Sequence, residues 1–209
     1  MLDRSLEGLQ TCRCFRAQVV SSLDHTVTLN ESSDWLELAE RLANYFASDG
    51  FYIDAIRWWT STLEIRKRAL GPEHSNTLHT MNKLAFSYWK LGRTKEAAQL
   101  HEETLEIQKR ALGPEHPDTL QSMNNLAASY WSLGRMKESA QLNEETLEIQ
   151  KQALGLEHPD TLESMNGLAA AYRSLGRTKE AAQLDEETLE IRKRVLGPEH
   201  RNCEGGESG

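Results

Sequence analysis

The sequence lacks the features of several protein classes, and these absences reduce the number of functions that it could have. Its only cysteines, Cys12, Cys14 and Cys203, are too few for a disulfide framework, so we expect a reducing, cytoplasmic environment. No run of 18 apolar residues occurs, and the N-terminus has no apolar segment of the signal-peptide type. The sequence therefore predicts neither a membrane span nor secretion.

Basic residues are also scarce, with 24 Lys and Arg against 32 Asp and Glu, a net charge of −8. A nucleic-acid-binding protein needs a basic face to meet phosphates, so we expect no nucleic-acid partner. There is no Gly-x-x-x-x-Gly-Lys-Ser/Thr phosphate loop and no nucleophile–base set. Cys12, Cys14 and His25 are three ligands at irregular spacing, short of a zinc signature. We therefore expect no enzyme, no cofactor and no metal.

An internal repeat dominates what is present. The string Leu-Gly-x-Glu-His recurs every 42 residues, at Leu70, Leu112, Leu154 and Leu196. Successive copies between residues 70 and 195 are identical at 31 of 42 positions. An older, divergent copy precedes them, and a fifth begins at Leu196 and is cut off after a few residues. The expected organisation is an unassigned segment 1–33, four units over 34–69, 70–111, 112–153 and 154–195, and a truncated repeat with a flexible tail over 196–209.

Each unit is predicted to form two helices. In the third unit, Pro117 begins a helix whose apolar residues are spaced three and four apart, and Gly134 ends it. A second helix follows from about Met136 to Ala153. Neither helix could bury its apolar stripe alone, but stacked pairs could. The fold class expected is therefore all-α, a superhelical solenoid of antiparallel helix pairs.

The pattern Leu126-Ala127-x-x-Tyr130, with Gly134 and Leu147, resembles the tetratricopeptide repeat. The long 42-residue form is similar to the repeats of kinesin light chain and to the arrays of fungal NB-ARC or NACHT receptors. This resemblance covers about residues 34–200 and implies a right-handed solenoid that binds a protein or extended peptide in a concave groove. The register of the family places these residues in the groove: Asn82, Asn124, Asn166, His79, Gln121, Phe86, Trp89, Trp131 and Arg173.

The asparagine column is the most informative part of this predicted groove. In kinesin light chain the matching positions contact cargo peptides, so the resemblance implies the same for Asn82, Asn124 and Asn166. Three bonds of about 0.5–1.5 kcal/mol each cannot supply the roughly −8 kcal/mol of micromolar binding. An aromatic anchor would be needed, and Phe86, Trp89 and Trp131 are the candidates. Alternatively, the asparagines bond between neighbouring helices and only stabilise the stack.

Two other recurring features favour structural roles. The histidines of the links, His74, His116, His158 and His200, are expected to close the turn or cap the next helix. The glutamate pairs, such as Glu102-Glu103, recur on the second helix of each unit, where we expect a solvated outer face with ordinary ion pairs along the helix.

Two functions remain compatible with these observations. The first is a non-catalytic scaffold that binds proteins in its groove, an adaptor like kinesin light chain. The second is the ligand-sensing segment of a signalling NTPase receptor, which the near-identity of the copies favours, because such arrays gain and lose repeats by duplication. Self-association through the uncapped C-terminal repeat is a further interaction that the sequence allows.

Overall fold

The computed structural model describes residues 33–196 of the chain. The predictions made for Cys12, Cys14, His25, His200, Cys203 and the truncated fifth repeat fall outside these residues. Within them the chain forms eight helices and no strand. The helices are α2 (Ser33–Ser48), α3 (Tyr52–Leu70), α4 (Ser75–Lys90), α5 (Thr94–Ala111), α6 (Pro117–Ser132), α7 (Met136–Ala153), α8 (Pro159–Ser174) and α9 (Thr178–Leu196).

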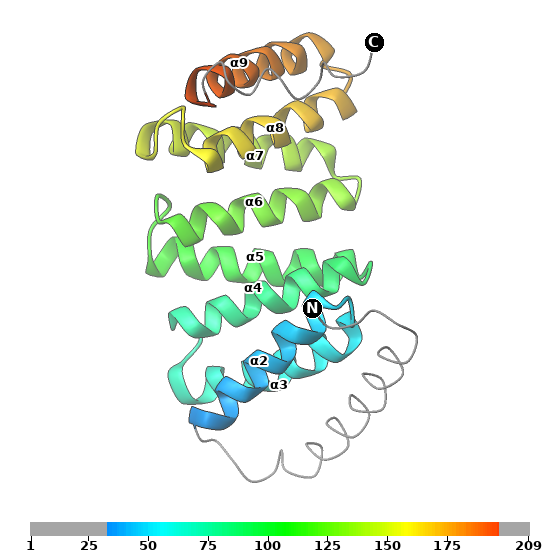
Figure 1. Cartoon of the computed structure of the whole chain (residues 1–209), viewed down its shortest axis with the longest axis vertical. Coiled ribbons are helices and arrows are strands. Elements are labelled where there is room, and N and C mark those ends of the chain that lie inside the picture. The colour runs from blue at the N-terminus through cyan, green and yellow to red at the C-terminus, as the bar shows by residue number, and fades with distance from the viewer. Residues whose placement is uncertain (1–32, 197–209) are drawn as a thin grey trace, which may run out of the picture.

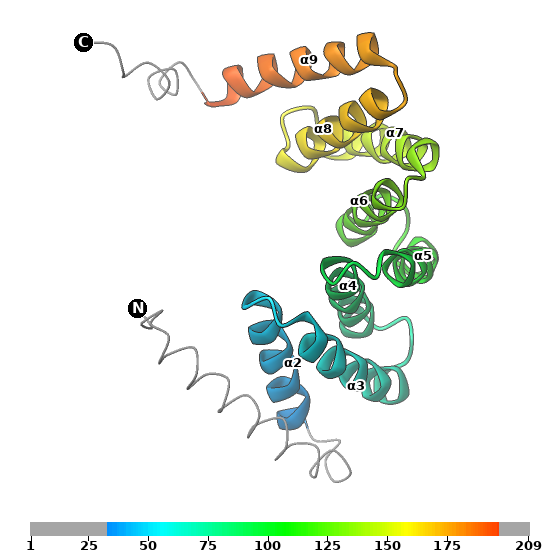
Figure 2. The ribbon, with the colours of Figure 1, turned by 90° about the vertical axis from the view of Figure 1, so that its right-hand side faces the viewer.

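The helices stack in the order of the sequence, each packed against the one before it and the one after it (Figure 1). Seen from the side, they form an arc (Figure 2). The first helix of each pair, α2, α4, α6 or α8, lies on the inner side of the arc, and α3, α5 and α7 lie on the outer side. The predicted all-α, right-handed solenoid is confirmed.

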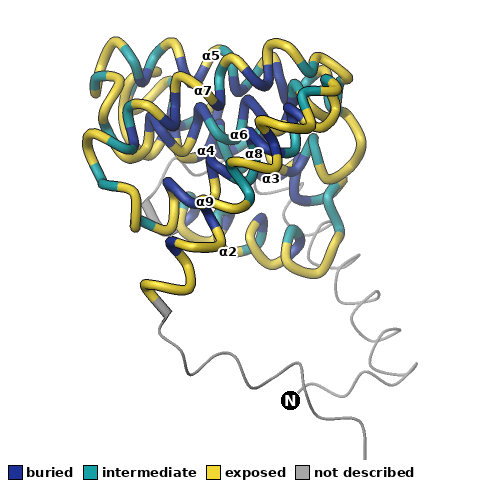
Figure 3. Tube along the Cα trace, turned by 90° about the horizontal axis from the view of Figure 1, so that it is seen from above, coloured by how far each residue is buried: buried dark blue, intermediate teal, exposed yellow. Residues whose placement is uncertain are grey.

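The core lies in the seams between neighbouring helices and forms three clusters of buried apolar side chains along the stack. In α6 the predicted stripe is buried, with Met123 fully inaccessible and Leu120 at 2% exposure. On α7, Ala140 and Leu147 are buried, as the helical spacing predicts. The buried positions lie where neighbouring helices face one another, and exposed positions cover the outside and the links (Figure 3).

The helix ends follow the signals in the sequence. Gly134 has a φ of +76°, which a residue with a Cβ adopts only with strain, and it ends α6 at the predicted place. At the start of α6, Nδ1 of His116 accepts a hydrogen bond from the backbone N–H of Asp118 at 3.2 Å. His74 and His158 cap α4 and α8 in the same way. The capping role predicted for these three histidines is therefore confirmed.

The glutamate pairs of the second helices make contacts that differ from the expected pairs along one helix. Lys109 of α5 bonds to Glu145 of α7 at 2.8 Å, so this ion pair joins two repeats. The hydroxyl of Tyr130 donates to Glu102 at 2.8 Å, and the guanidinium of Arg135 lies 4.0 Å above the Tyr130 ring. Burial, followed by the bond to Glu102, raises the pKa of Tyr130 to about 12. These glutamates therefore connect neighbouring repeats.

Two glycines of different conformation give a test of the helix ends. Replacing Gly134 by Ala places a Cβ at positive φ, and we expect unfolding to become easier by about 1–2 kcal/mol. Replacing Gly167 by Ala, inside α8, adds a methyl group that meets the Asn143 side chain at an ordinary 3.5 Å. That change removes a helix-destabilising glycine and should stabilise by up to about 1 kcal/mol.

Urea unfolding followed by circular dichroism measures both variants. The midpoint should fall for Gly134→Ala and rise for Gly167→Ala. Equal shifts in one direction would contradict the different roles assigned to the two glycines.

Candidate functional site

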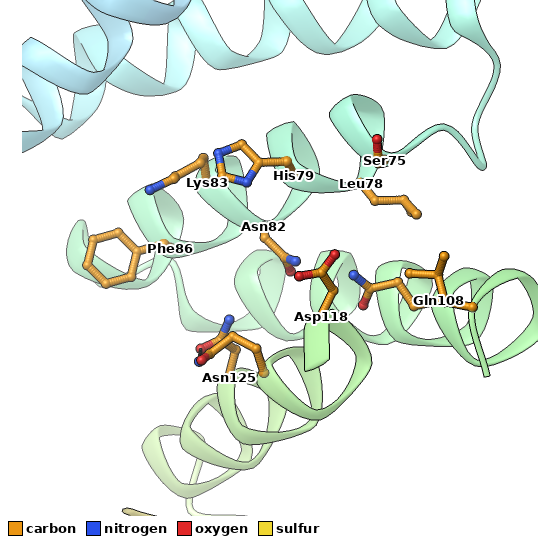
Figure 4. Close-up of a pocket in the computed structure, with 11 residues that line it drawn as sticks. Ser75, Leu78, His79, Asn82, Lys83, Phe86, Gln108, Asp118 and Asn125 are labelled. Atoms are coloured by element: carbon orange, nitrogen blue, oxygen red, sulfur yellow. Dashed lines mark hydrogen bonds between the residues drawn. The ribbon is translucent and has the colours of Figure 1, made fainter. Parts of the chain in front are cut away.

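A pocket of about 310 Å³ is lined by residues of α4 and α6, the helices that lie on the inner side of the arc (Figure 4). The second helix between them, α5, contributes to its floor. The residues that line it are Ser75, Leu78, His79, Asn82, Lys83, Phe86, Gln108, Leu112, Asp118, Gln121 and Asn125. Four of the nine predicted groove residues, His79, Asn82, Phe86 and Gln121, therefore meet in one pocket.

The asparagine column bonds from one repeat to the next. The amide nitrogen of Asn82 donates to the hydroxyl of Ser122 at 3.0 Å, and the hydroxyl of Ser164 donates to Oδ1 of Asn124 at 2.9 Å. The stacking role that the sequence left as an alternative is thus present for both residues. An amide offers two N–H groups and two lone pairs, so one bond to serine leaves donors and acceptors for a ligand. Asn166 lies in α8. The position 40 residues further on, where the matching partner would lie, falls outside the described residues.

Aromatic side chains lie near the C-terminal ends of α4 and α6. Phe86 is 44% exposed and Trp131 is 47% exposed, so both can contact a partner. Trp89 is half-buried, and its indole N–H donates to Ser132 of α6 at 2.8 Å, so this side chain also joins the stack. Lys90 lies 4.8 Å from the centre of the Trp89 ring.

The remaining predicted groove residues have local partners. Burial, and then the nearby Lys83, lower the pKa of His79, which favours a neutral imidazole. Gln121 is exposed and donates to Asn125 at 3.2 Å. Arg173 forms an ion pair with Asp185 of α9, so this guanidinium is already engaged at the last described repeat.

Seven pocket residues were not predicted from the sequence, and the most buried polar one among them is Gln108, which belongs to a second helix and not to the inner first helices. Gln108 belongs to α5 and is 2% exposed, yet its Oε1 has no hydrogen-bond partner among the described residues. Figure 4 shows its amide end near Asp118 and Asn82, while Lys83 and Phe86 lie at the other end of the pocket. The spacing Leu105, Gln108, Leu112 was the available signal, because it places a polar residue on an inward stripe.

The residue that matches Gln108 in the first repeat, 42 positions earlier, is Arg66. Arg66 is 7% exposed and its guanidinium makes three hydrogen bonds. It donates to Glu40 of α2 at 2.6 Å, to the hydroxyl of Thr80 at 2.6 Å and to the backbone oxygen of Asn76 at 3.2 Å. At the equivalent place between α2 and α4, the hydrogen-bonding groups therefore find their partners within the chain.

A larger cavity, of about 640 Å³, lies between α7 and α9. Three of the four glutamates that line it already have partners, since Glu144 binds Tyr172 and Arg177, Glu180 binds Arg177, and Glu187 forms an ion pair with Lys151. It therefore offers fewer unsatisfied groups than the pocket at Gln108. Across residues 33–196, no three or more His, Cys, Asp or Glu side chains are grouped to hold a metal ion, and none of the helices is long and apolar enough to cross a membrane.

Comparison with known proteins agrees with this architecture. The family model described as tetratricopeptide repeat matches residues 35–110, 80–152 and 123–194. The chain belongs to the tetratricopeptide repeat family. Members of this family are in general non-catalytic scaffolds for protein interaction. A search of curated proteins found no match.

Solved structures place this tetratricopeptide array near kinesin light chain-like proteins. A single-substitution variant of a Podospora anserina protein, described as a kinesin light chain with nearly identical TPR-like repeats, is 30% identical with a TM-score of 0.77. That match covers 91% of this chain and 89% of the other. BtubC (BKLC) from P. vanneervenii has a TM-score of 0.72 at 22% identity, over 83% of this chain and 69% of its own, which supports the fold alone.

A buried histidine beside the pocket-bearing repeat gives a pH-dependent prediction. His101 of α5 is 3% exposed, its Nδ1 lies 3.0 Å from the Ser129 hydroxyl, and burial lowers its pKa to about 4. The unfolded chain takes up this proton near pH 6.5 and the folded chain only near pH 4, so stability should fall as the pH drops through that window. The full loss is about 3 kcal/mol by linkage.

The third repeat supplies the control, since Asn143 occupies the matching position. The variant His101→Asn should lose less stability than the parent between pH 6.5 and 4, as measured by urea unfolding at several pH values. An identical pH profile for the two proteins would show that His101 does not titrate across this window.

Proposed function

We propose that this tetratricopeptide array is a non-catalytic scaffold that binds an extended protein segment along its inner face, in the manner of a kinesin light chain-like adaptor. The observation that carries this proposal is the pocket between α4 and α6, where side chains from two successive repeats converge. Concave sites with a few polar groups and apolar walls are the usual form of a ligand site.

The differences between the repeats support a role for this face. The units 70–111 and 112–153 differ at 11 positions, and seven of these lie in the first helix, α4 or α6. Five of the seven columns contribute a residue to the pocket, among them His79, Lys83, Phe86 and Asp118. The two copies thus share their core and differ where the pocket forms, as expected if ligand contacts vary along the array.

The Asn–Ser bonds also support peptide binding, because they fix the amide before a ligand arrives. Ser122 holds the Asn82 side chain in one orientation, so less conformational entropy is lost when a peptide backbone pairs with the remaining N–H and lone pair. Exposed Phe86 and Trp131 supply the apolar contact area that amide bonds alone cannot provide.

The structure offers a matched pair of variants to separate binding from stacking. Asn82→Ala and Ser122→Ala each remove the inter-repeat bond and should destabilise the array by a similar amount, about 0.5–1.5 kcal/mol. Only Asn82→Ala also removes the groove amide. Peptides selected from a random display library on the wild-type array provide the ligands, and their affinities are measured by fluorescence anisotropy.

We expect Asn82→Ala to weaken peptide binding about tenfold, the equivalent of roughly 1.4 kcal/mol. Ser122→Ala should leave binding within about threefold, because the amide remains. If both variants weaken binding equally, the column acts through stability alone. Failure to select any peptide that competes for the inner face would contradict the proposed function.

A second candidate is the ligand-sensing arm of a signalling NTPase receptor. The near-identity of the repeats, 31 of 42 positions over two successive comparisons, favours it, because recent duplication is typical of such arrays. Full-length cDNA sequencing distinguishes the two. A phosphate-loop domain encoded in frame upstream would identify a receptor, and a heptad-repeat segment there would identify a motor adaptor.

A further inference from the structure

One position of the repeat has a hydrogen-bonded side chain in the first copy and, among the described residues, a side-chain oxygen without a partner in the second. We call the two neighbouring first helices, with the second helix between them, a rung: the first is α2–α3–α4 and the second is α4–α5–α6. In the first rung the guanidinium of Arg66 is bonded to Glu40, Thr80 and Asn76. In the second rung this position is Gln108, whose buried Oε1 has no partner among the described residues and which lines the pocket.

The groups that hold the Arg66 guanidinium have counterparts in the second rung. The hydroxyl of Thr80 is replaced by that of Ser122, and the residue at the Glu40 position is Asn82. The backbone oxygen of Asn76 corresponds to that of Asp118, and the side chain of Asp118, which is 64% exposed, brings a carboxylate to the lining of the pocket. At this position the first rung therefore pairs a carboxylate with a buried guanidinium, whereas the second rung has a carboxylate and a neutral amide.

We propose that the pocket of the second rung binds the guanidinium of an arginine side chain in the docked peptide, in the place that Arg66 fills one repeat earlier. The carboxylate of Asp118 and the unpartnered Oε1 of Gln108 are its acceptors. This inference rests on the proposed function, since the arginine is part of a peptide bound along the inner face. Arginine fits better than lysine because its planar fork donates several hydrogen bonds at once.

The charges around the pocket agree with this assignment. Asp118 and Gln108 lie together at one end, whereas Lys83 lies beside Phe86 at the other (Figure 4). The low pKa of His79 keeps that imidazole neutral near pH 7, so it adds no positive charge. A guanidinium at the Asp118 end therefore meets acceptors, and a following acidic or aromatic peptide residue would meet Lys83 and Phe86.

The third rung, α6–α7–α8, repeats the same set of groups. Gln150 is 1% exposed and its Oε1 also has no partner among the described residues. Asp160, Ser164 and Asn124 take the places of Asp118, Ser122 and Asn82. The inner face thus carries the same acceptor groups in two successive rungs, and peptides with two arginines should bind more tightly than peptides with one.

The test compares peptides selected on the array with analogues in which arginine is replaced by citrulline, which keeps the shape and removes the charge. We expect the citrulline peptide to bind at least about tenfold more weakly to the wild-type protein. The variant Asp118→Asn, which introduces the residue found in the first rung, should weaken the arginine peptide to a similar extent and leave the citrulline peptide nearly unchanged. Glu106→Gln, an exposed carboxylate on α5, is the control for net charge and should have no effect.

A second variant, Gln108→Arg, supplies an internal cation as in the first rung and should also weaken the arginine peptide about tenfold. The inference is overturned if selected peptides bind the inner face with equal affinity in arginine and citrulline forms, and the proposed function then stands. If no peptide binds, the proposed function fails. N-acetyl-arginine amide then tests the site separately, since only binding there shifts the NMR signals of the Gln108 side-chain amide in the ¹⁵N-labelled protein.

Discussion

The whole structure depends on one constraint: each helix can bury its apolar stripe only against its neighbours in the stack. The stripe of α6, with Leu120, Met123 and Leu126, is covered by α5 and α7. Because the repeat length is fixed at 42 residues, every side chain near this seam meets a residue of the adjacent copy at a constant offset. Asn82 and Asn124 therefore bond to serines 40 residues further on. The polar contacts follow from the register that apolar burial imposes.

This fixed register turns single substitutions into differences of function. The position shared by Arg66, Gln108 and Gln150 lies on the second helix of three successive repeats, between the two neighbouring first helices. A long cationic side chain there donates hydrogen bonds to the acceptors of its own rung. A neutral amide instead leaves its own buried oxygen without a donor among the described residues. An unsatisfied buried acceptor is unfavourable by about 1–3 kcal/mol, which is free energy that a ligand donor can recover on binding. A nearly uniform scaffold can thus present unequal sites without changing its backbone.

The sequence predicts the parts of this structure that depend on local chemistry. The apolar spacing, Gly134 at the end of α6 and the capping by His116 need only one helix and its link, and each was foreseen. Apart from the inter-helix bonds that the sequence left open for the asparagines, the partners across repeats were not foreseen, because they depend on how far one helix is staggered against the next. Residue spacing along one helix does not contain that stagger. The pairing of Lys109 with Glu145, and of Arg66 with Glu40, could therefore only be seen in three dimensions.

Packing along the array is uneven, and this bears on where a ligand can be held. In the first pair of helices Trp59 is fully buried, whereas the matching positions later are His101, Asn143 and Asp185. At the far end Leu189 is 51% exposed, although its counterparts Leu105 and Leu147 are buried. Within the described residues, apolar burial at this position is therefore less complete on α9 than on α5 and α7. The pocket between α4 and α6 lies between helices that are covered on both sides, and the bond from Asn82 to Ser122 and the burial of Gln108 hold its amides in place before a ligand binds.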